Sequence, residues 1–164
     1  MNNPGVCAEC AKSGPSCCQL SRIFLTEGDK CRILEWSGDD EFYEREAAGT
    51  RPVPPDMSID PLWYKTFTHP RGRLVLRQIA NGDCCFLRPD GCALPLEVRP
   101  LVCRLYPFEY NQDTIKGIHA HRCPRDVSDN APLLLALLGM NRERGEEWRR
   151  LFYRELEEEY GGGA

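Results

Sequence analysis

Gly82 to Phe108, which reads GDCCFLRPDGCALPLEVRPLVCRLYPF, is the stretch of sequence that decides the fold. It contains four of the ten cysteines in a chain of 164 residues. Cysteine makes up about 6% of the residues, which is less than small secreted disulfide scaffolds contain and far more than an ordinary cytosolic enzyme contains. What these cysteines do is the main question that the sequence raises.

Turn residues within and before this stretch predict a small antiparallel β meander at the centre of the fold. Residues 73–80 (RLVLRQIA) are typical of a strand, and the Asn-Gly pair at 81–82 favours a tight hairpin that returns along residues 83–87. A second turn over residues 89–91 (PDG) leads to a short segment over residues 92–94. Three short strands are therefore expected side by side.

The N-terminal side of the meander predicts two helices. A capping-box pattern at Thr26 and Asp29 indicates a helix over about residues 27–36. Three residues are expected on the inner side of this helix: Cys31, Ile33 and Leu34. A second, acidic helix is predicted over residues 39–48. Four prolines within residues 49–61 then indicate an irregular connection.

The C-terminal side predicts further regular elements. Residues 96–108 favour a short helical turn between two prolines, and residues 114–120 are typical of one more strand. Residues 128–160 indicate helix, with an apolar first half and an amphipathic second half rich in Glu and Arg. Gly139 and Gly145 are expected to divide this region into two helices.

Together these elements predict one α+β domain. We expect a small, irregular, metal-organised domain with a short antiparallel β meander, loop-rich cysteine segments and C-terminal helices. Residues 1–127 form the cysteine-cluster metal-binding domain in this prediction, and the helices of residues 128–160 pack on the same domain. Residues 161–164 are expected to be a frayed tail.

Composition and charge narrow the classes of function. The chain carries 21 Lys and Arg against 25 Asp and Glu, a net charge of −4, which argues against a strongly basic nucleic-acid-binding protein. The first residues lack a secretory signal, and the longest apolar run, residues 132–138, is too short to span a bilayer. We therefore expect a soluble cytoplasmic protein without nucleic-acid or membrane partners. Clustered thiols in a reducing cytosol favour metal binding; a disulfide-stapled exported protein is the alternative.

The N-terminal cysteines have the spacing of metal ligands. Cys7 and Cys10 form a C-x2-C pair, in which a tight turn directs two thiolates at one metal ion. Cys17 and Cys18 are adjacent, and adjacent side chains diverge in both helices and strands. Their sulfurs therefore suit two different metal atoms, which favours a polynuclear centre over a single tetrahedral ion.

A second group of cysteines lies in the second half of the chain: Cys84, Cys85, Cys92, Cys103 and Cys123. The predicted hairpin brings Cys84 or Cys85 near Cys92, and only one of these two can face the same side, because side chains alternate along a strand. A single buried cysteine is often only a packing residue. Ten cysteines in two clusters do not fit that explanation.

The histidines give a weaker signal. His119 and His121 alternate with Cys123, so all three can face one side of a strand and form a mixed His/Cys site. We favour the alternative, in which the two histidines face solvent or hydrogen-bond to the ligands from outside. His69, followed by a proline, is typical of a loop.

Taken in order, the cysteine blocks form a specific pattern. Residues 7–18 read C-x2-C-x6-C-C, residues 84–87 read CCFL and residues 92–94 read CAL. RPLVCRLYPF follows over residues 99–108, and Cys123 comes last. This order resembles the YkgJ-type cysteine cluster family, which is characterised by eight cysteines that chelate zinc or iron. The likeness extends over most of the chain.

Carried over residue by residue, this resemblance implies eight metal ligands: Cys7, Cys10, Cys17, Cys18, Cys84, Cys92, Cys103 and Cys123. Cys31 and Cys85 fall where the family has other residues. This agrees with an inward-facing Cys31 on a helix and with Cys85 pointing away from Cys84. Many relatives have the N-terminal spacing C-x3-C-x2-C-C, so the gap between Cys10 and Cys17 is longer here.

Eight thiolates are enough for two four-cysteine centres or for one polynuclear cluster with spare ligands. We favour an iron–sulfur cluster over zinc, because the Cys17-Cys18 pair suits several metal atoms. Three arginines beside the cysteines can offset the thiolate charge: Arg99, Arg104 and Arg122. Pairing of these arginines with surface carboxylates or solvent is an equal alternative.

The resemblance implies a binding capacity and leaves two classes of function open. In the first, the protein is a metal-binding module without catalysis. In the second, it is an S-adenosylmethionine-dependent protein lysine methylase-like enzyme that uses the metal centre, since flagellin lysine-N-methylases contain a related cysteine block. The sequence has no GxGxxG loop after a predicted strand and no evident nucleophile and base outside the cysteines, so we favour the first class. Metal ions are the expected partners, and the sequence indicates no protein partner.

Overall fold

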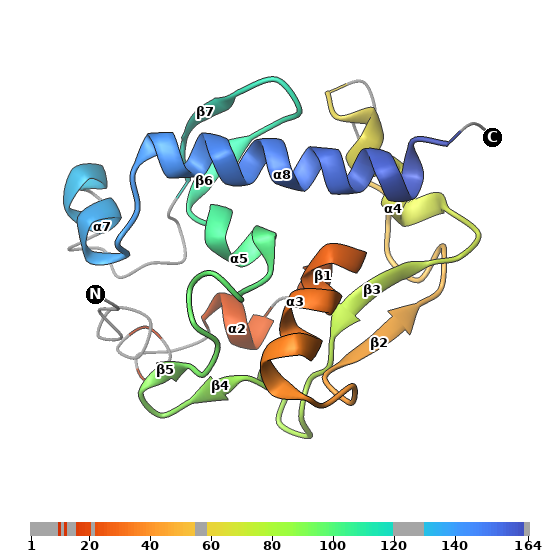
Figure 1. The fold of residues 1–164 in the computed structure, drawn as a ribbon, viewed down its shortest axis with the longest axis horizontal. Helices are drawn as coiled ribbons and strands as arrows, with labels where there is room; N and C mark the ends of the chain where they lie inside the picture. The colour runs from red at the N-terminus through yellow and green to blue at the C-terminus, as the bar shows by residue number, and fades with distance from the viewer. Residues whose placement is uncertain are drawn as a thin grey trace.

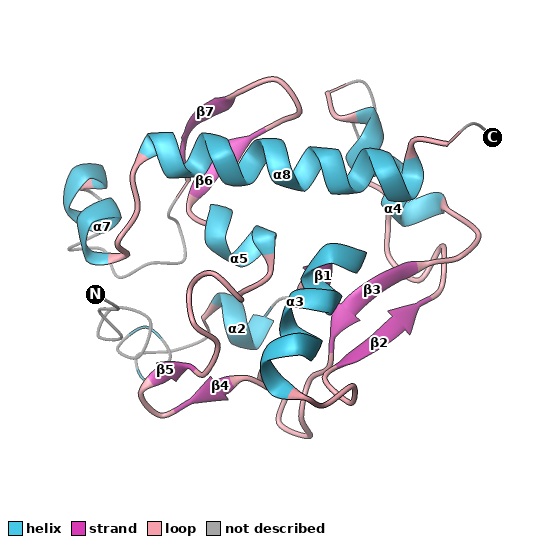
Figure 2. Ribbon diagram, viewed as in Figure 1, coloured by secondary structure: helices cyan, strands magenta, loops and turns pink. Residues whose placement is uncertain are grey.

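The computed structural model describes residues 10, 12, 16–20, 22–54, 59–119 and 130–162, apart from the side chains of residues 17 and 20. Helices and short antiparallel sheets are interspersed along this part of the chain (Figure 2), so the α+β fold class is confirmed. The helices are α2 (Cys17–Leu20), α3 (Glu27–Ser37), α4 (Pro61–Thr68), α5 (Leu101–Leu105), α7 (Ala131–Leu137) and α8 (Arg142–Tyr160). The strands are β1 (Phe24–Leu25), β2 (Tyr43–Glu46), β3 (Arg73–Leu76), β4 (Leu87–Arg88), β5 (Gly91–Cys92), β6 (Phe108–Tyr110) and β7 (Ile115–Ile118).

Strand β3 forms the centre of a three-stranded antiparallel sheet, with β1 at one edge and β2 at the other. All four β3 residues are buried, so the backbone groups on both edges of the strand need partners within the protein. β2 supplies one edge, paired from Tyr43 with Leu76 to Glu46 with Arg73. The predicted acidic helix over residues 39–48 is therefore wrong, because pairing with β3 overrides the local helix preference of this segment.

The segment after β3 turns twice, as predicted, but forms only a fragment of the meander. Gly82 has a φ of 91° in the first turn, and a single bridge joins Gln78 to Cys84. The chain then turns again at once, with the Leu87 N–H donating to the Cys84 carbonyl at 2.9 Å. β4 and β5 pair around the second predicted turn. The regular strand expected over residues 83–87 is wrong, because β3 already has β1 and β2 as its neighbours.

Helix α3 begins with the predicted capping box. The Asp29 N–H donates to the Thr26 hydroxyl at 2.9 Å, and the Thr26 N–H donates to the Asp29 carboxylate at 3.1 Å. Asp29 and Ile33, one turn apart, form the buried face of the helix. Cys31 and Leu34 lie off this face and are exposed. The helix is confirmed, and the inward orientation predicted for Cys31 and Leu34 is wrong.

Helix α8 carries the main apolar face of the protein. Trp148, Phe152 and Leu156 are each one turn from the next and are buried. They belong to a cluster, here called the α8 core, that also contains Phe24 of β1 and Leu101 of α5. Figure 1 shows α8 running above α5, with the β6–β7 hairpin beside it. None of the helices in the described ranges is long and apolar enough to cross a membrane.

A second apolar cluster, here called the sheet core, packs between α3, the central sheet and the segment that follows it. It is built from these buried residues: Leu25, Ile33, Phe42, Leu74, Leu76, Cys84, Phe86 and Leu94. Cys18, Cys85 and Cys92 pack against it and are partly buried. Several cysteines of both sequence groups therefore gather at this one cluster.

Two features of the helices differ from the sequence prediction. The C-terminal helices are divided at Gly139, which has a φ of 66°, whereas Gly145 lies within α8. A Cβ at Gly145 would overlap the Phe108 ring, so glycine allows α8 to approach β6. The prediction also contains no helix over residues 61–68, where Asp60 caps α4 with its side chain and Pro61 occupies the first turn.

A buried polar network joins α3, α5 and α8. Asp29 is fully buried and accepts a hydrogen bond at 3.1 Å from the Leu101 N–H, a group that α5 itself cannot satisfy. Arg32 donates to Asp29 at 2.7 Å and to Glu155 of α8 at 2.6 Å. The Thr26 hydroxyl also donates to Glu155. The three helices therefore share one set of charged partners.

Replacing Asp29 tests this network. Asp29→Ala leaves the Leu101 N–H and the Arg32 guanidinium without their buried acceptor, so we expect the free energy of unfolding to fall by about 2 to 4 kcal/mol. Urea unfolding followed by circular dichroism measures the change. The exposed Asp39, whose side chain accepts a local bond from the Glu41 N–H, provides the control: Asp39→Ala should change stability by less than about 0.5 kcal/mol. Equal losses in the two variants would contradict the proposed role of Asp29.

Glu159 near the end of α8 makes stability depend on pH. Its carboxylate accepts from the Glu27 N–H at 2.6 Å, and burial, with nearby Glu27, Glu155 and Asp29, raises its pKa from 4.5 to about 7. The folded state thus holds this proton more tightly than the unfolded state, so stability falls as pH rises from about 4.5 to about 7. Glu159→Gln keeps an acceptor and removes the charge.

We expect Glu159→Gln to raise the free energy of unfolding at pH 8 by about 1 kcal/mol and to have little effect at pH 4.5. Urea unfolding at the two pH values measures this difference. Glu158→Gln, at an exposed position on the same helix, is the matched control and should give no such pH-dependent gain. A gain of the same size at both pH values would show that the ionisation of Glu159 is not its cause.

Candidate functional site

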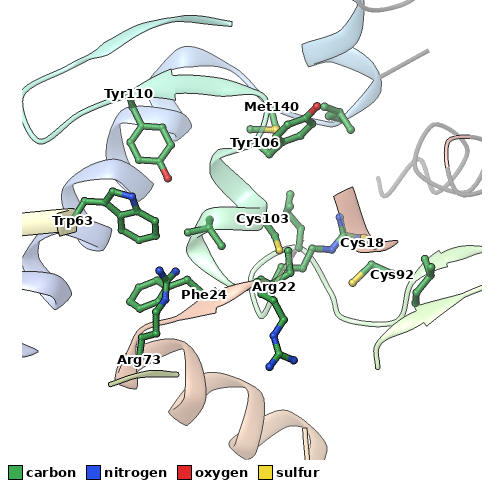
Figure 3. Close-up of a pocket in the computed structure, with 16 residues that line it drawn as sticks. Cys18, Arg22, Phe24, Trp63, Arg73, Cys92, Cys103, Tyr106, Tyr110 and Met140 are labelled. Carbon is green, nitrogen blue, oxygen red and sulfur yellow. The ribbon is translucent and has the colours of Figure 1, made fainter. Parts of the chain in front are cut away.

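A cavity of about 420 Å³ lies where the α8 core meets the sheet core. Among the described residues, its lining includes three cysteines, three arginines and four aromatic side chains, and no Asp or Glu. Figure 3 shows Cys18, Cys92 and Cys103 toward one side of this space and Phe24, Trp63 and Tyr110 toward the other. We call the part lined by Cys18, Cys92 and Cys103 the cysteine end, and the part lined by Phe24, Trp63, Arg73 and Tyr110 the aromatic end.

The cysteine end is assembled from three separate elements. Cys18 comes from α2, Cys92 from β5 and Cys103 from α5 (Figure 3). The Cys84 N–H donates to the Cys18 carbonyl at 2.8 Å, and this backbone bond joins the N-terminal cysteine segment to the central one. Two groups of cysteines that are far apart in sequence therefore meet at one place in the fold.

Cys92 interacts with both a neighbouring thiol and a guanidinium. Burial raises the pKa of the Cys92 thiol above its usual range, and the nearby Cys84 raises it further. Arg99 acts in the opposite direction, since its charge and a hydrogen bond to Cys92 favour the thiolate. Arg99 is held for this contact by a bond from its Nε to the Leu94 carbonyl at 3.0 Å. Arg99, one of the three arginines considered as counter-charges, therefore lies beside a cysteine in the fold.

Cys84 and Cys85 contact each other, whereas the sequence predicts that they point to opposite sides. A hydrogen bond with Cys85, together with burial, raises the pKa of the Cys84 thiol, and the same bond lowers the pKa of Cys85. The Cys85 thiol also lies 3.6 Å from the Phe42 carbonyl. The prediction fails because the chain turns at this point, so the alternation of side chains in a strand does not apply.

The other predicted site residues divide into three groups. Cys7, Cys123, His121 and Arg122, and the side chain of Cys17, lie outside the described residues. Cys10 is described and half-buried, and His119 is exposed just after β7. Arg104 is buried and turns away from the cavity lining, with its Nε donating to the Arg99 carbonyl at 2.7 Å. Within the described part of the chain, no three His, Cys, Asp or Glu side chains form a group that could hold a metal ion.

The aromatic end contains residues that the sequence analysis did not identify. Arg73 projects from β3 and lies 5.0, 5.1 and 4.2 Å from the ring centres of Phe24, Trp63 and Phe67. Arg73 comes from β3, Phe24 from β1, and Trp63 and Phe67 from one face of α4, so no single local spacing brings the arginine to all three rings. The one available signal was an arginine at the start of the apolar run RLVL, a charged residue in a strand that is buried on both faces.

The cysteine end gathers thiols and positive charge, although its described side chains do not form a metal-ligand group. Three predicted ligands line it, Cys84 lies beside Cys92, and Arg22 and Arg99 provide positive charge in the same lining. Thiolate centres with several cysteines carry net negative charge, which guanidinium groups offset. Arg22 is shared, because it also pairs with Glu44 at 2.5 Å.

No family model, curated protein or solved structure matches this chain. The likeness to the YkgJ-type family therefore rests on the cysteine and Arg-Pro blocks of the sequence. What the cavity can bind is determined by its own lining, with thiols at one end and a guanidinium among aromatic rings at the other.

Proposed function

We propose that the protein binds a thiolate-ligated metal centre at the cysteine end of the cavity. Cys18, Cys92 and Cys103 are ligands in this proposal, together with Cys84 behind Cys92. The remaining four predicted ligands complete the set: Cys7, Cys10, Cys17 and Cys123. The preferred centre is an iron–sulfur cluster, and zinc is the alternative.

One observation carries this proposal. Three of the cysteines that the resemblance implies as ligands come from three different elements, and all three line the same cavity. Packing alone gives no reason for this, since a cysteine that serves as a small apolar residue can lie anywhere in a core. The exposed Cys31, which the family pattern leaves out, lies on α3 and is not among the described lining residues.

The volume of the cavity favours a polynuclear centre. A zinc ion needs four ligands at about 2 Å and no space beyond its own radius. A cluster of several metal and sulfide ions fills a larger volume between its thiolates. The cavity of about 420 Å³ extends from these thiols to the aromatic end, and a cluster would take up the part of it beside Cys18, Cys92 and Cys103.

The surroundings also support deprotonated cysteines. A thiolate is the form that binds metal, and burial by itself opposes it, as it does at Cys92. The hydrogen bond and charge of Arg99 favour the Cys92 thiolate, and a metal ion would favour it much more strongly. When bound, the centre supplies cross-links between segments or a site for electron transfer. The chain itself supplies the ligands, the positive charge and an apolar wall.

Such a centre has a structural consequence. α2 is four residues long and is joined to the central segment by the backbone bond between Cys84 and Cys18. A metal shared by Cys18, Cys92 and Cys103 would link α2, β5 and α5 by bonds much stronger than that contact. We therefore propose a metal-binding module without catalysis of its own as the function that the site supports best.

Metal analysis of the anaerobically purified protein tests the proposal. We expect brown protein that contains iron and acid-labile sulfide in comparable amounts, with charge-transfer absorption in the visible range. Colourless protein with zinc and no sulfide would exclude the iron–sulfur cluster and retain the thiolate site. Protein that holds no metal, even after reconstitution with iron and sulfide or with zinc, would exclude the proposed function.

Single cysteine variants locate the site. Cys92→Ser and Cys103→Ser each remove one thiolate from the cysteine end, so we expect the metal content per chain to fall below about half of the wild-type value and the melting temperature to fall with it. Cys31→Ser is the matched control, because Cys31 is exposed on α3, and it should leave the metal content unchanged. Equal loss in all three variants, or none in the first two, would show that the metal is not held at this end.

A further inference from the structure

The guanidinium of Arg73 at the aromatic end is buried and only partly paired. Its side chain is 7% exposed, and within the described part of the structure its Nε and Nη1 atoms have no hydrogen-bond partner. The carboxylate that pairs with it is Glu46, whose Oε2 lies 4.0 Å from the Arg73 Nε, beyond hydrogen-bond distance. A buried guanidinium with unused donors is costly unless a partner completes it.

Glu46 does not complete Arg73 in this arrangement: its Oε2, the oxygen nearer Arg73, also has no hydrogen-bond partner among the described residues, and its Oε1 is shared by two other arginines. Its Oε1 lies 3.1 Å from the Arg51 Nε and 3.6 Å from the Arg22 Nε. One carboxylate thus faces three guanidinium groups, and within the described part of the chain only Arg22 has a second acid, Glu44, at 2.5 Å. Burial lowers the pKa of Arg73 to about 10, so the group still carries its charge at neutral pH. The described lining of the cavity contains no acid that balances it.

Aromatic rings surround the charge. Phe24, Trp63 and Phe67 lie around the Arg73 guanidinium, and Trp63 and Phe24 also line the cavity. Figure 3 shows the guanidinium of Arg73 and the hydroxyl of Tyr110 both directed into the space beside the Trp63 indole. The site therefore combines one cation, one hydroxyl and flat apolar walls.

We propose that the aromatic end of the cavity binds a small organic acid, with its carboxylate on the guanidinium of Arg73 and its apolar body against Trp63 and Phe24. A planar carboxylate matches the fork of a guanidinium and brings one negative charge, which is the charge that Arg73 lacks. The cavity volume of about 420 Å³ lies within the range of pockets for small molecules.

The same features argue for a carboxylate over a phosphate. A phosphate carries up to two charges and needs several strong donors, which sites usually supply as arginine clusters or helix N-termini. At the aromatic end a single guanidinium stands among rings, and Arg22 is already paired with Glu44 and Glu46. Apolar walls favour a hydrophobic acid and give no compensation for a second charge.

This inference does not depend on the metal centre. The ligand groups that hold the acid lie at the aromatic end, and those that hold the metal lie at the cysteine end of the same cavity. The acid can therefore be tested on the protein as purified, with its metal content determined in the same sample. If no metal is found, the acid site can still be tested by ligand binding. If no acid binds, the metal site can still be tested by metal analysis.

Titration calorimetry with phenylacetate and with phenylacetamide tests the inference. The two probes have nearly the same shape and differ in charge, so a site built on Arg73 should discriminate between them. We expect phenylacetate to bind saturably with a Kd of about 0.1 to 1 mM, as suits a ligand of this size, and phenylacetamide to bind at least about tenfold more weakly. Equal binding of acid and amide, or saturable binding of neither, would overturn the proposal.

Two arginine variants then assign the effect. Arg73→Met keeps an apolar side chain and removes the charge, and the preference for the acid should disappear. Arg51→Met is the matched control, since Arg51 also pairs with Glu46 but is not among the described lining residues, and it should keep the preference. Thermal unfolding verifies that both variants are folded. If Arg73→Met is unfolded, the binding of phenylacetate and of phenylacetamide is compared between Arg73→Lys and the wild type instead. A preference for the acid that survives in folded Arg73→Met would overturn the assignment.

Discussion

The buried carboxylate of Asp29 is the contact on which the arrangement of the helices depends. It takes part in the capping box of α3, accepts the Leu101 N–H of α5, and pairs with Arg32, which also binds Glu155 of α8. A buried carboxylate that lost these partners would be strongly destabilising, so the three helices have to meet at this point. Gly28 lets α3 approach the Glu155 side chain of α8, because any Cβ at this position would overlap the Glu155 carboxylate.

The contacts of Asp29 also position the elements that line the cavity. α5 begins at Leu101, whose N–H donates to Asp29, and this helix carries Cys103 to the cysteine end. β1 runs directly into α3 and places Phe24 at the aromatic end. The opposite wall is held by the bond between Cys84 and Cys18. The cavity is thus bounded by two separate apolar clusters that do not close completely against each other.

Local signals in the sequence predicted the elements that local interactions create. The Thr26 and Asp29 capping box and the turn at Gly82 depend on residues close in the chain, and both are present in the structure. β2 and the contact between Cys84 and Cys85 were not predicted, because one depends on pairing with a distant strand and the other on an immediate turn. For the same reason spacing could point to the cysteines, whereas Arg73 and its ring partners become a site only through the fold.

The balance of charge in the cavity involves both of its ends. The thiolates proposed at the cysteine end and the carboxylate proposed at the aromatic end would both be anionic, and anions buried in one cavity repel each other strongly unless cations lie between them. Arg22, Arg73 and Arg99 come from separate segments and line the same space, with no acid among the described lining residues. Two of them have other partners, Arg99 with Cys92 and Arg22 with Glu44 and Glu46. Of the three arginines in the lining, Arg73 is therefore the one whose charge is available to bind the carboxylate of the proposed acid.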